Sequence, residues 1–323
     1  MTSLRGVLLA LSFFCAFASA QGPGAAMGML SGDGGGKKEP FSAEIRFMPS
    51  QRVQGQDTSL SLAQYQINGA FPLGKWGDTL FLGRVGLGYW GIDTEAVLPR
   101  TAPMPNELWN ISLGVSAVHK FDNGWRLIAN ASGGSASDKP FEDINGVNAN
   151  LMGILNIPWG DRDSWSLGAL YSPLGQVPFP IPIVSYRWVP SDQCSVNIGL
   201  PMAITYKPSD DWTFEASYMI LTLIRTRATW NFDPSLRVYA GFEWLNQGFH
   251  LAGQPFDERF FYDDKRVLMG VQVLAVENFS LDVSTGYAWD RVFREGEGFG
   301  GARGTRVDVE PGPFVAARVS VRW

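Results

Sequence analysis

The feature that most constrains this chain is a pair of alternating segments within residues 108–135, separated by Asp122-Asn123-Gly124. In each segment every second residue is apolar, and the residues between are Asn, Ser, Gly or Arg. An alternation of period two is typical of a β-strand with one apolar and one polar face. The apolar positions are Trp109, Ile111, Leu113, Val115, Ala117 and Phe121, then Trp125, Leu127, Ala129, Ala131 and Gly133.

The register of this hairpin follows from the pattern. A two-residue Asn123-Gly124 turn would pair Asp122 with Trp125 and place the two apolar faces on opposite sides of the sheet. A three-residue loop with Gly124 in the left-handed conformation pairs Phe121 with Trp125 and keeps both apolar faces together. We therefore predict the three-residue loop, which also places Ser116 opposite Asn130.

The apolar face begins and ends in aromatic residues, which favours a strand with lipid outside and water inside. Charged residues make up 18% of the chain, below the roughly 25% of soluble domains. After residue 20 no apolar run reaches the roughly 18 residues of a membrane-spanning helix. The predicted fold is all-β: a single antiparallel, up-and-down transmembrane β-barrel.

Alternating segments recur from residue 41 to residue 323, and their connections alternate between short and long. Short turns are expected at 122–124, 159–163, 190–193, 208–211, 233–235 and 275–278, and long loops at 91–107, 136–146, 171–182, 249–264 and 291–305. This is the layout of outer-membrane barrels with short periplasmic turns and long extracellular loops. We predict about 16 strands, or 12 to 14 if the short segments near Pro201 and Leu221 do not pair.

Residues 1–20 have the pattern of a cleaved signal peptide, with Arg5, an apolar core and Ala18-Ser19-Ala20. Residues 21–40 are Gly-rich and are expected to be flexible, and residues 41–323 form the predicted barrel. Beyond the signal, Cys194 is the single cysteine, so stability is expected to come from a closed hydrogen-bonded sheet rather than from a disulfide. The predicted location is the outer membrane of a Gram-negative bacterium.

If the apolar faces meet lipid, charged residues of the polar faces line the lumen. The candidates are the basic residues Arg46, Arg84, Arg126, Arg225, Arg227, Arg237, Arg266 and Arg318 and the acidic residues Glu44, Glu215, Glu243, Asp282 and Asp290. Eight arginines and five acids leave an excess of three positive charges, although the whole chain has a net charge of −5. Either these groups form cross-strand ion pairs, or the excess gives the lumen a preference for anions. A three-residue loop at 233–235 would pair Arg225 with Glu243.

The chain carries two histidines. His119 has the parity of the lipid-facing residues, and His250 opens a long loop in which it could meet Asp257 or Asp263. No G-x-S-x-G motif, CxxC, HExxH or phosphate-binding loop accompanies them. We therefore predict no catalytic residue, no cofactor and no metal site, and the acidic net charge gives no indication of nucleic-acid binding.

Several short motifs resemble a bacterial outer-membrane β-barrel family known as domain of unknown function 6268. They lie at residues 178–182 (PFPIP), 190–192 (PSD), 208–212 (PSDDW), 260–266 (FFYDDKR) and 286–291 (GYAWDR). The resemblance covers residues 41–323 and implies a barrel in contact with outer-membrane lipid and lipopolysaccharide, but it implies no substrate. Trp323 resembles the terminal aromatic that the outer-membrane assembly machinery recognises.

Three functional hypotheses follow. The first is a pore or passive transporter for small solutes with a weakly anion-favouring lumen. The second is a structural or loop-presenting barrel plugged by its own side chains. The third is a barrel enzyme with its site in the outer loops, which would depend on His250.

Overall fold

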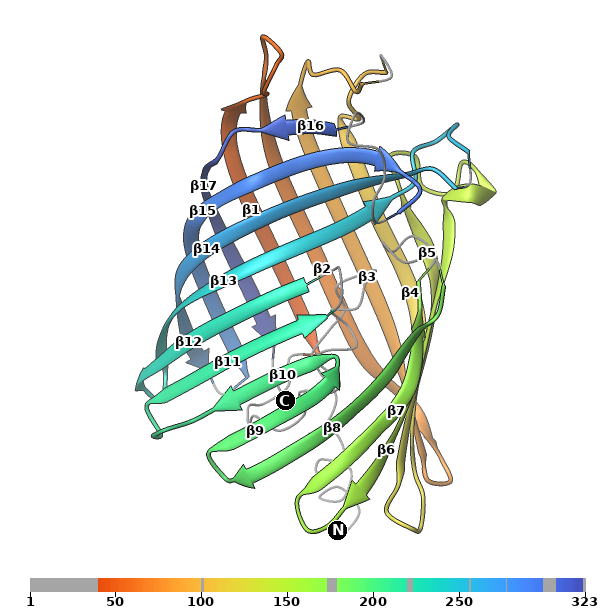
Figure 1. Ribbon diagram of the computed structural model, residues 1–323, viewed down its shortest axis with the longest axis vertical. Coiled ribbons are helices and arrows are strands. Elements are labelled where there is room, and N and C mark those ends of the chain that lie inside the picture. Colours follow the sequence, from red (N-terminus) through yellow and green to blue (C-terminus); the bar gives the residue numbers. More distant parts are fainter. Residues whose placement is uncertain are drawn as a thin grey trace.

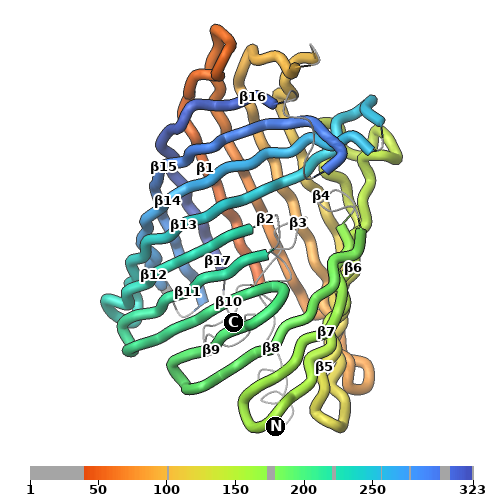
Figure 2. Tube along the Cα trace, in the orientation of Figure 1, coloured from red at the N-terminus to blue at the C-terminus, as the bar shows by residue number. Residues whose placement is uncertain are grey.

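The computed structural model describes residues 40–99, 102–172, 179–219, 223–255, 257–276, 278–298 and 306–321. They form one antiparallel sheet that closes on itself as a barrel (Figures 1 and 2). Its strands are β1 (Phe41–Arg52), β2 (Ser59–Trp76), β3 (Thr79–Thr94), β4 (Glu107–Lys120), β5 (Arg126–Ser137), β6 (Val147–Trp159), β7 (Asp163–Tyr171), β8 (Ile181–Ser191), β9 (Cys194–Leu200), β10 (Met202–Tyr206), β11 (Trp212–Met219), β12 (Leu223–Asp233), β13 (Leu236–Phe249), β14 (Arg259–Val276), β15 (Phe279–Gly296), β16 (Arg306–Val309) and β17 (Gly312–Val321). A 3₁₀ turn, Ile144–Gly146, precedes β6.

Each strand pairs with its neighbours in the chain, and β1 pairs with β17 to close the barrel. β16 and β17 occupy one position, because β15 pairs with β16 near its end and with β17 along the rest of its length. The barrel therefore has sixteen strand positions, as the alternation predicted. No helix within the described residues is long and apolar enough to cross a membrane.

The predicted hairpin is confirmed in β4 and β5. The Phe121 N–H donates to the Trp125 carbonyl at 2.9 Å, the Gly124 N–H donates to the Phe121 carbonyl at 3.0 Å, and Gly124 has φ of 83°. Ser116 lies opposite Asn130 and donates to its Oδ1 at 3.3 Å. The apolar face points outward, since Leu113 is 65% exposed at the middle of β4.

The short segments near Pro201 and Leu221 do pair, which excludes the counts of 12 to 14. β9, β10 and β11 have 7, 5 and 8 residues, fewer than the roughly 9 to 11 that span a bilayer. Pro201 alone connects β9 to β10, so no long loop lies there. In Figure 1 this hairpin ends much nearer the short turns than β5 and β13 do. We refer to β9, β10 and β11 as the low wall.

β14 and β15 are longer than predicted. Each has 18 residues, as does β2. The loops predicted at 249–264 and 291–305 are therefore wrong in extent, because β14 already begins at Arg259 and β15 continues to Gly296. The added inward residues Phe260, Tyr262 and Phe293 are buried. We call the end of the barrel that these extensions reach, opposite the short turns, its outer end.

An arginine is expected to destabilise the barrel more on the outer face of β4 than on its inner face. Leu113→Arg puts a charge against hydrocarbon and should lower the free energy of unfolding by about 2 to 4 kcal/mol. Ser112→Arg places the same side chain on the partly exposed inner face and should cost less. Urea unfolding of the two variants in lipid vesicles measures the difference, and equal losses would contradict the assigned faces.

Candidate functional site

An apolar core fills the outer end of the barrel on one side, and we call it the seal. Twenty described side chains belong to it: Met48, Val53, Leu60, Leu62, Trp90, Ile92, Ala96, Leu98, Met104, Leu108, Ala136, Phe249, Leu251, Phe260, Tyr262, Ala288, Phe293, Val307, Val309 and Phe314. Trp90 of β3 packs edge-on against Phe249 and Tyr262, each with ring centroids 5.1 Å from its own. Strands far apart in the barrel thus meet across its interior.

The seal is reinforced where β5 and β13 meet. These strands lie eight positions apart in a barrel of sixteen, so they belong to opposite walls. The His250 N–H donates to the Ala136 carbonyl and the Ala252 N–H donates to Asp138 Oδ1, both at 2.8 Å. Ser137 and His250 also form a parallel bridge. The start of the β13–β14 connection therefore crosses the mouth and is fixed to the far wall.

The size of the seal decides whether it opens readily. Burial of one large apolar side chain contributes about 1.5 to 3 kcal/mol. Most of the twenty side chains are of this size, so breaking their contacts would be costly. This part of the barrel is closed at its outer end in the structure.

Between the seal and the short turns lies a polar interior, which we call the chamber. Its wall from β12 through β17 to β1 carries charged side chains, with Arg225 42% exposed to the interior. The opposite wall, β4 to β10, carries fewer charges, and its inward row mixes neutral polar with apolar side chains. There Ser166 donates to Asn156 at 2.7 Å and Asn150 donates to Asn148 at 2.9 Å. The chamber is therefore asymmetric, with charge concentrated on one wall.

Glu243 is the centre of the charged wall. Its carboxylate lies 2.9 Å from Arg225 Nε and 3.7 Å from Arg266 Nε. Arg266 also donates from Nη2 to Asp264 at 3.0 Å, and both of these side chains are at most 1% exposed. The predicted pairing of Arg225 with Glu243 is confirmed, and it is part of a buried chain of alternating charges.

Two smaller groups adjoin this chain. Arg46 donates to Glu44 at 2.7 Å and to Gln64 at 3.3 Å. Arg46 and Arg266 each place Cζ 5.8 Å from the Phe314 ring. On the other side, the Tyr239 hydroxyl donates to Asp282 at 2.5 Å, while Arg227 Cζ lies 3.9 Å from the Tyr239 ring.

The remaining candidates also occupy inner positions. Arg84 lies opposite Gly114, Arg126 opposite Asn156, Arg237 opposite Gln272, and Arg318 between Glu44 and Asp282. Glu215 is an exposed partner of Arg227 in the register of β11 and β12. Trp323 lies outside the described residues.

The assignment of Asp290 to the lumen is wrong. It has φ of 47° beside an irregularity in the β14–β15 register, and its carboxylate accepts from Lys265 Nζ at 2.7 Å. Lys265 lies next to the inward Arg266 in sequence and so belongs to the other face. Two inner acids, Asp264 and Glu295, lie in segments that were predicted as loops. Two inner arginines, Arg187 of β8 and the buried Arg291 of β15, were also missed, so the inner face keeps an excess of positive charge.

A second apolar cluster lies inside the barrel behind the low wall, and we call it the inner cluster. It contains Ile128, Met152, Ile154, Leu170 and Ile183 from β5 to β8, and Met219, Leu223 and Leu245 from β11 to β13. Alternation alone did not predict it, because the inward row of these strands mixes apolar residues with Ser and Asn.

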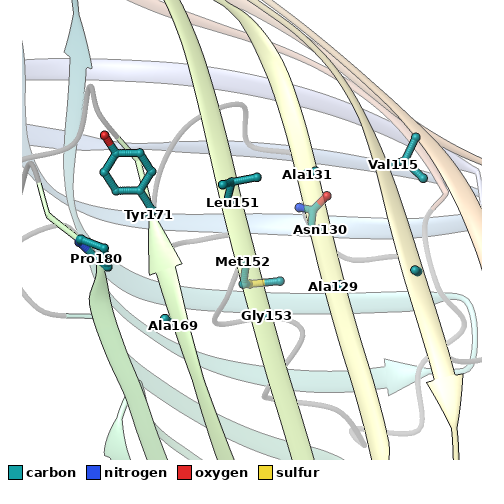
Figure 3. A pocket seen from close by; sticks show the side chains of 11 residues that line it. Val115, Ala129, Asn130, Ala131, Leu151, Met152, Gly153, Ala169, Tyr171 and Pro180 are labelled. Carbon is teal, nitrogen blue, oxygen red and sulfur yellow. The ribbon is translucent and has the colours of Figure 1, made fainter.

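On the lipid face of β4 to β7 lies a depression of about 570 Å³ (Figure 3). Its floor is a cross-strand row of small residues, Ala117, Ala129, Gly153 and Ala169, which are successive register partners. Leu151, Tyr171 and Pro180 border it at the end near β8. The depression is therefore lined almost entirely by carbon.

Neither histidine forms the pair with an acid that catalysis would require. His119 lies on the outer face, with Nδ1 2.8 Å from the Thr79 hydroxyl. His250 is fully buried, and its Nε2 lies 3.2 Å from the Pro255 carbonyl rather than near Asp257 or Asp263. No group of three or more His, Cys, Asp or Glu side chains suited to a metal ion occurs in the part of the chain that the structure describes.

A family model described as "Domain of unknown function (DUF6268)" matches residues 79–294. No curated protein matches the sequence. Among solved structures, OccK7 (OpdD) of Pseudomonas aeruginosa is 10% identical over 88% of this chain and 98% of its own, with a TM-score of 0.40. OpdQ of the same species is 11% identical over 88% and 97%, with a TM-score of 0.39. The COG4313 outer membrane channel from Pseudomonas putida F1 is 11% identical over 88% and 95%, with a TM-score of 0.34. The likeness is one of fold alone.

The buried charges predict a contrast between neighbouring residues of β14. Arg266→Met leaves Asp264 and Glu243 buried without their shared cation and should lower the free energy of unfolding by about 3 to 5 kcal/mol. Lys265→Met removes the partly exposed partner of Asp290 and should cost less than about 1 kcal/mol. Urea unfolding in lipid vesicles tests this, and a small loss at Arg266 would show that water compensates the charges.

Proposed function

The chain belongs to the family described as Domain of unknown function (DUF6268), and we propose that it is a passive transporter of small solutes with an anion-favouring chamber. The observation that carries the proposal is the charged wall around Glu243, where Arg225 and Arg227 are partly exposed to the interior. A barrel that served only as a scaffold would not need solvent-accessible charge inside.

The ion-pair chain itself is balanced, because Glu243 and Asp264 meet Arg225 and Arg266. The excess of positive charge on this wall comes from the other predicted residues, Arg46, Arg227, Arg237 and Arg318 against Glu44 and Asp282. The two sequence-based hypotheses, ion pairs and an anion preference, are therefore compatible. In a narrow interior between low-dielectric walls, such an excess raises the local concentration of anions.

The seal favours a second candidate function, a plugged structural barrel. Its twenty described residues close one side of the outer end, and a barrel with no remaining route would transport nothing. The two candidates differ in a single measurable property, the flux of solute.

The proposed location is the outer membrane, reached through the export signal predicted in residues 1–20. There the outward apolar face would contact lipid and lipopolysaccharide, and Trp323 would serve the assembly machinery. Both segments lie outside the described residues, so this part of the proposal depends on the sequence pattern. Protease-resistant, heat-modifiable protein in isolated outer membranes would support it.

The function is tested by release of two ions of similar size from proteoliposomes, benzenesulfonate and phenyltrimethylammonium. We expect the wild-type protein to release the anion faster than the cation. Arg225→Gln combined with Arg227→Gln should bring the two rates towards equality, because both partly exposed arginines are removed. Release equal to that of protein-free vesicles for both ions would support the plugged barrel instead.

The matched control is Arg162→Gln. Arg162 lies in the turn between β6 and β7, where its half-exposed side chain pairs with Asp192 at 2.9 Å outside the chamber. The substitution also removes one positive charge, but it should leave the ratio of the two rates unchanged. A shift as large as that of the chamber variant would mean that net charge, rather than the chamber, sets the preference.

A further inference from the structure

A buried arginine lies beside the seal without a carboxylate partner. Arg291 of β15 is 1% exposed, and Arg266 is the other arginine among the largest fully buried side chains of the described residues. Arg266 pairs with Asp264, whereas no described carboxylate lies within 4.0 Å of the Arg291 guanidinium. An arginine does not lose its proton in a protein, so Arg291 is a buried cation.

A β-bulge at Asp290 turns Arg291 inward. Ala288 is buried on the inner face, so strict alternation would place Asp290 inside and Arg291 outside. Asp290 instead has φ of 47°, and the β14–β15 register shifts between Asp263 and Lys265. Asp290 therefore pairs with Lys265 on the outer face, and Arg291 takes the inner position. The bulge thus replaces an acid by a base beside the seal.

A single residue accepts a hydrogen bond from Arg291 within the part of the chain that the structure describes. The guanidinium donates to the Tyr262 hydroxyl, which itself donates to Asp264 Oδ2 at 3.2 Å. The other inner acid of this region, Glu295, is four residues or about 13 Å further along β15 and accepts from Gln254 at 2.7 Å. Neither acid therefore neutralises Arg291 directly.

The charges of the neighbouring ion-pair chain leave Arg291 as the odd member. Asp264 and Glu243 are matched by Arg266 and Arg225. Arg291 adds one more positive charge and brings no acid with it. Because a buried ion without a counter-ion strongly destabilises a fold, one further negative charge is needed beside Arg291.

The unpartnered edge of Arg291 indicates where that charge would bind. Its Nε and Nη2 atoms are buried and have no hydrogen-bond partner among the described residues, and they form one edge of the planar guanidinium. Such an edge holds one anion by two charge-assisted hydrogen bonds. On the side away from Tyr262, the register partner of Arg291 is Val309, which belongs to the seal, as does Phe293, the next inner residue of β15. A bulky anion could not reach a guanidinium enclosed in this way.

We infer that Arg291 binds a small inorganic monoanion, of the size of a halide ion, at the edge of the seal. The single charge follows from the single unmatched cation, and the small size follows from the burial of the guanidinium. The ion is a structural component of the closed outer end and stabilises it whether or not the chamber transports solute. The inference is therefore independent of the proposed function.

The direct test is diffraction from crystals of the protein soaked in sodium bromide, at a wavelength where bromine scatters anomalously. We expect an anomalous peak within hydrogen-bond distance of both Arg291 Nε and Arg291 Nη2. Water at this edge, with bromide confined to the molecular surface, would mean an adventitious ion only and would overturn the inference.

Stability in solution gives a second test. Urea unfolding in lipid vesicles is measured at constant ionic strength while chloride replaces gluconate, which is too bulky for the site. An ion that binds the folded state alone shifts the folding equilibrium by mass action. Each tenfold rise in chloride should therefore raise the folding equilibrium constant by a factor that approaches ten as the site fills. Arg291→Met removes the binding edge and should abolish this dependence.

The matched control is Arg294→Met. Arg294 lies on the outer face of the same strand, where it pairs with Asp263 at 3.2 Å, so the substitution removes an equal charge outside the seal. Its chloride dependence should equal that of the wild-type protein. If Arg291→Met does not fold, Arg291→Lys keeps the charge but lacks the two-nitrogen edge. It should need roughly tenfold more chloride for the same stabilisation, because one charge-assisted hydrogen bond is lost.

The outcomes separate this inference from the proposed function. A chloride dependence that persists in Arg291→Met but disappears in the Arg225→Gln, Arg227→Gln double variant would locate the ion in the chamber. That result would overturn the inference and support the anion-favouring chamber. A wild-type protein whose stability does not respond to chloride also overturns the inference, and it leaves the transport proposal unaffected.

Discussion

Apolar packing across the barrel, between β3 and β13–β14, is the interaction on which the rest of the structure depends. A barrel of sixteen strand positions encloses more space than a single layer of side chains fills. Contact of Trp90 with Phe249 and Tyr262 draws these walls together at the outer end. The remaining interior is thereby divided into a closed side and a side bounded by the low wall.

The charged wall is stable because of where this packing lies. Arg266 and Asp264 are almost completely buried directly beside the seal, with Phe314 next to Arg266. In a buried site of low dielectric constant an ion pair is strong, but an unpaired ion destabilises the fold. Every charged residue of this chain therefore needs its partner. Arg225 is at the far end of that chain and is the most exposed of its members.

The sequence predicts which face of the sheet a side chain occupies better than it predicts which residues that side chain contacts. Period two placed Leu113 outward and Ser116 inward, and the loop length at Gly124 fixed the register, because both depend only on neighbours in one hairpin. The seal and the inner cluster were not predicted, since contacts such as Trp90 with Tyr262 join strands that are distant in the chain. Asp264 was misplaced for a related reason: its acidic pair with Asp263 is typical of a loop, and only burial beside Arg266 makes it a strand residue.

Differences in strand length produce both the seal and the low wall. Strands β14 and β15 have 18 residues and carry the inward Tyr262 and Phe293 far enough for Tyr262 to pack against Trp90 of β3 across the mouth. β10 has five residues and begins directly after Pro201, and β9 to β11 contribute no residue to the seal. Hydrogen bonding fixes each strand to its neighbours, and among the described residues 246–249 of β13 pair only with β14, where β13 extends past β12. Hydrocarbon tolerates such edges only where protein or water covers them, so this boundary is where the barrel must differ from a simple cylinder.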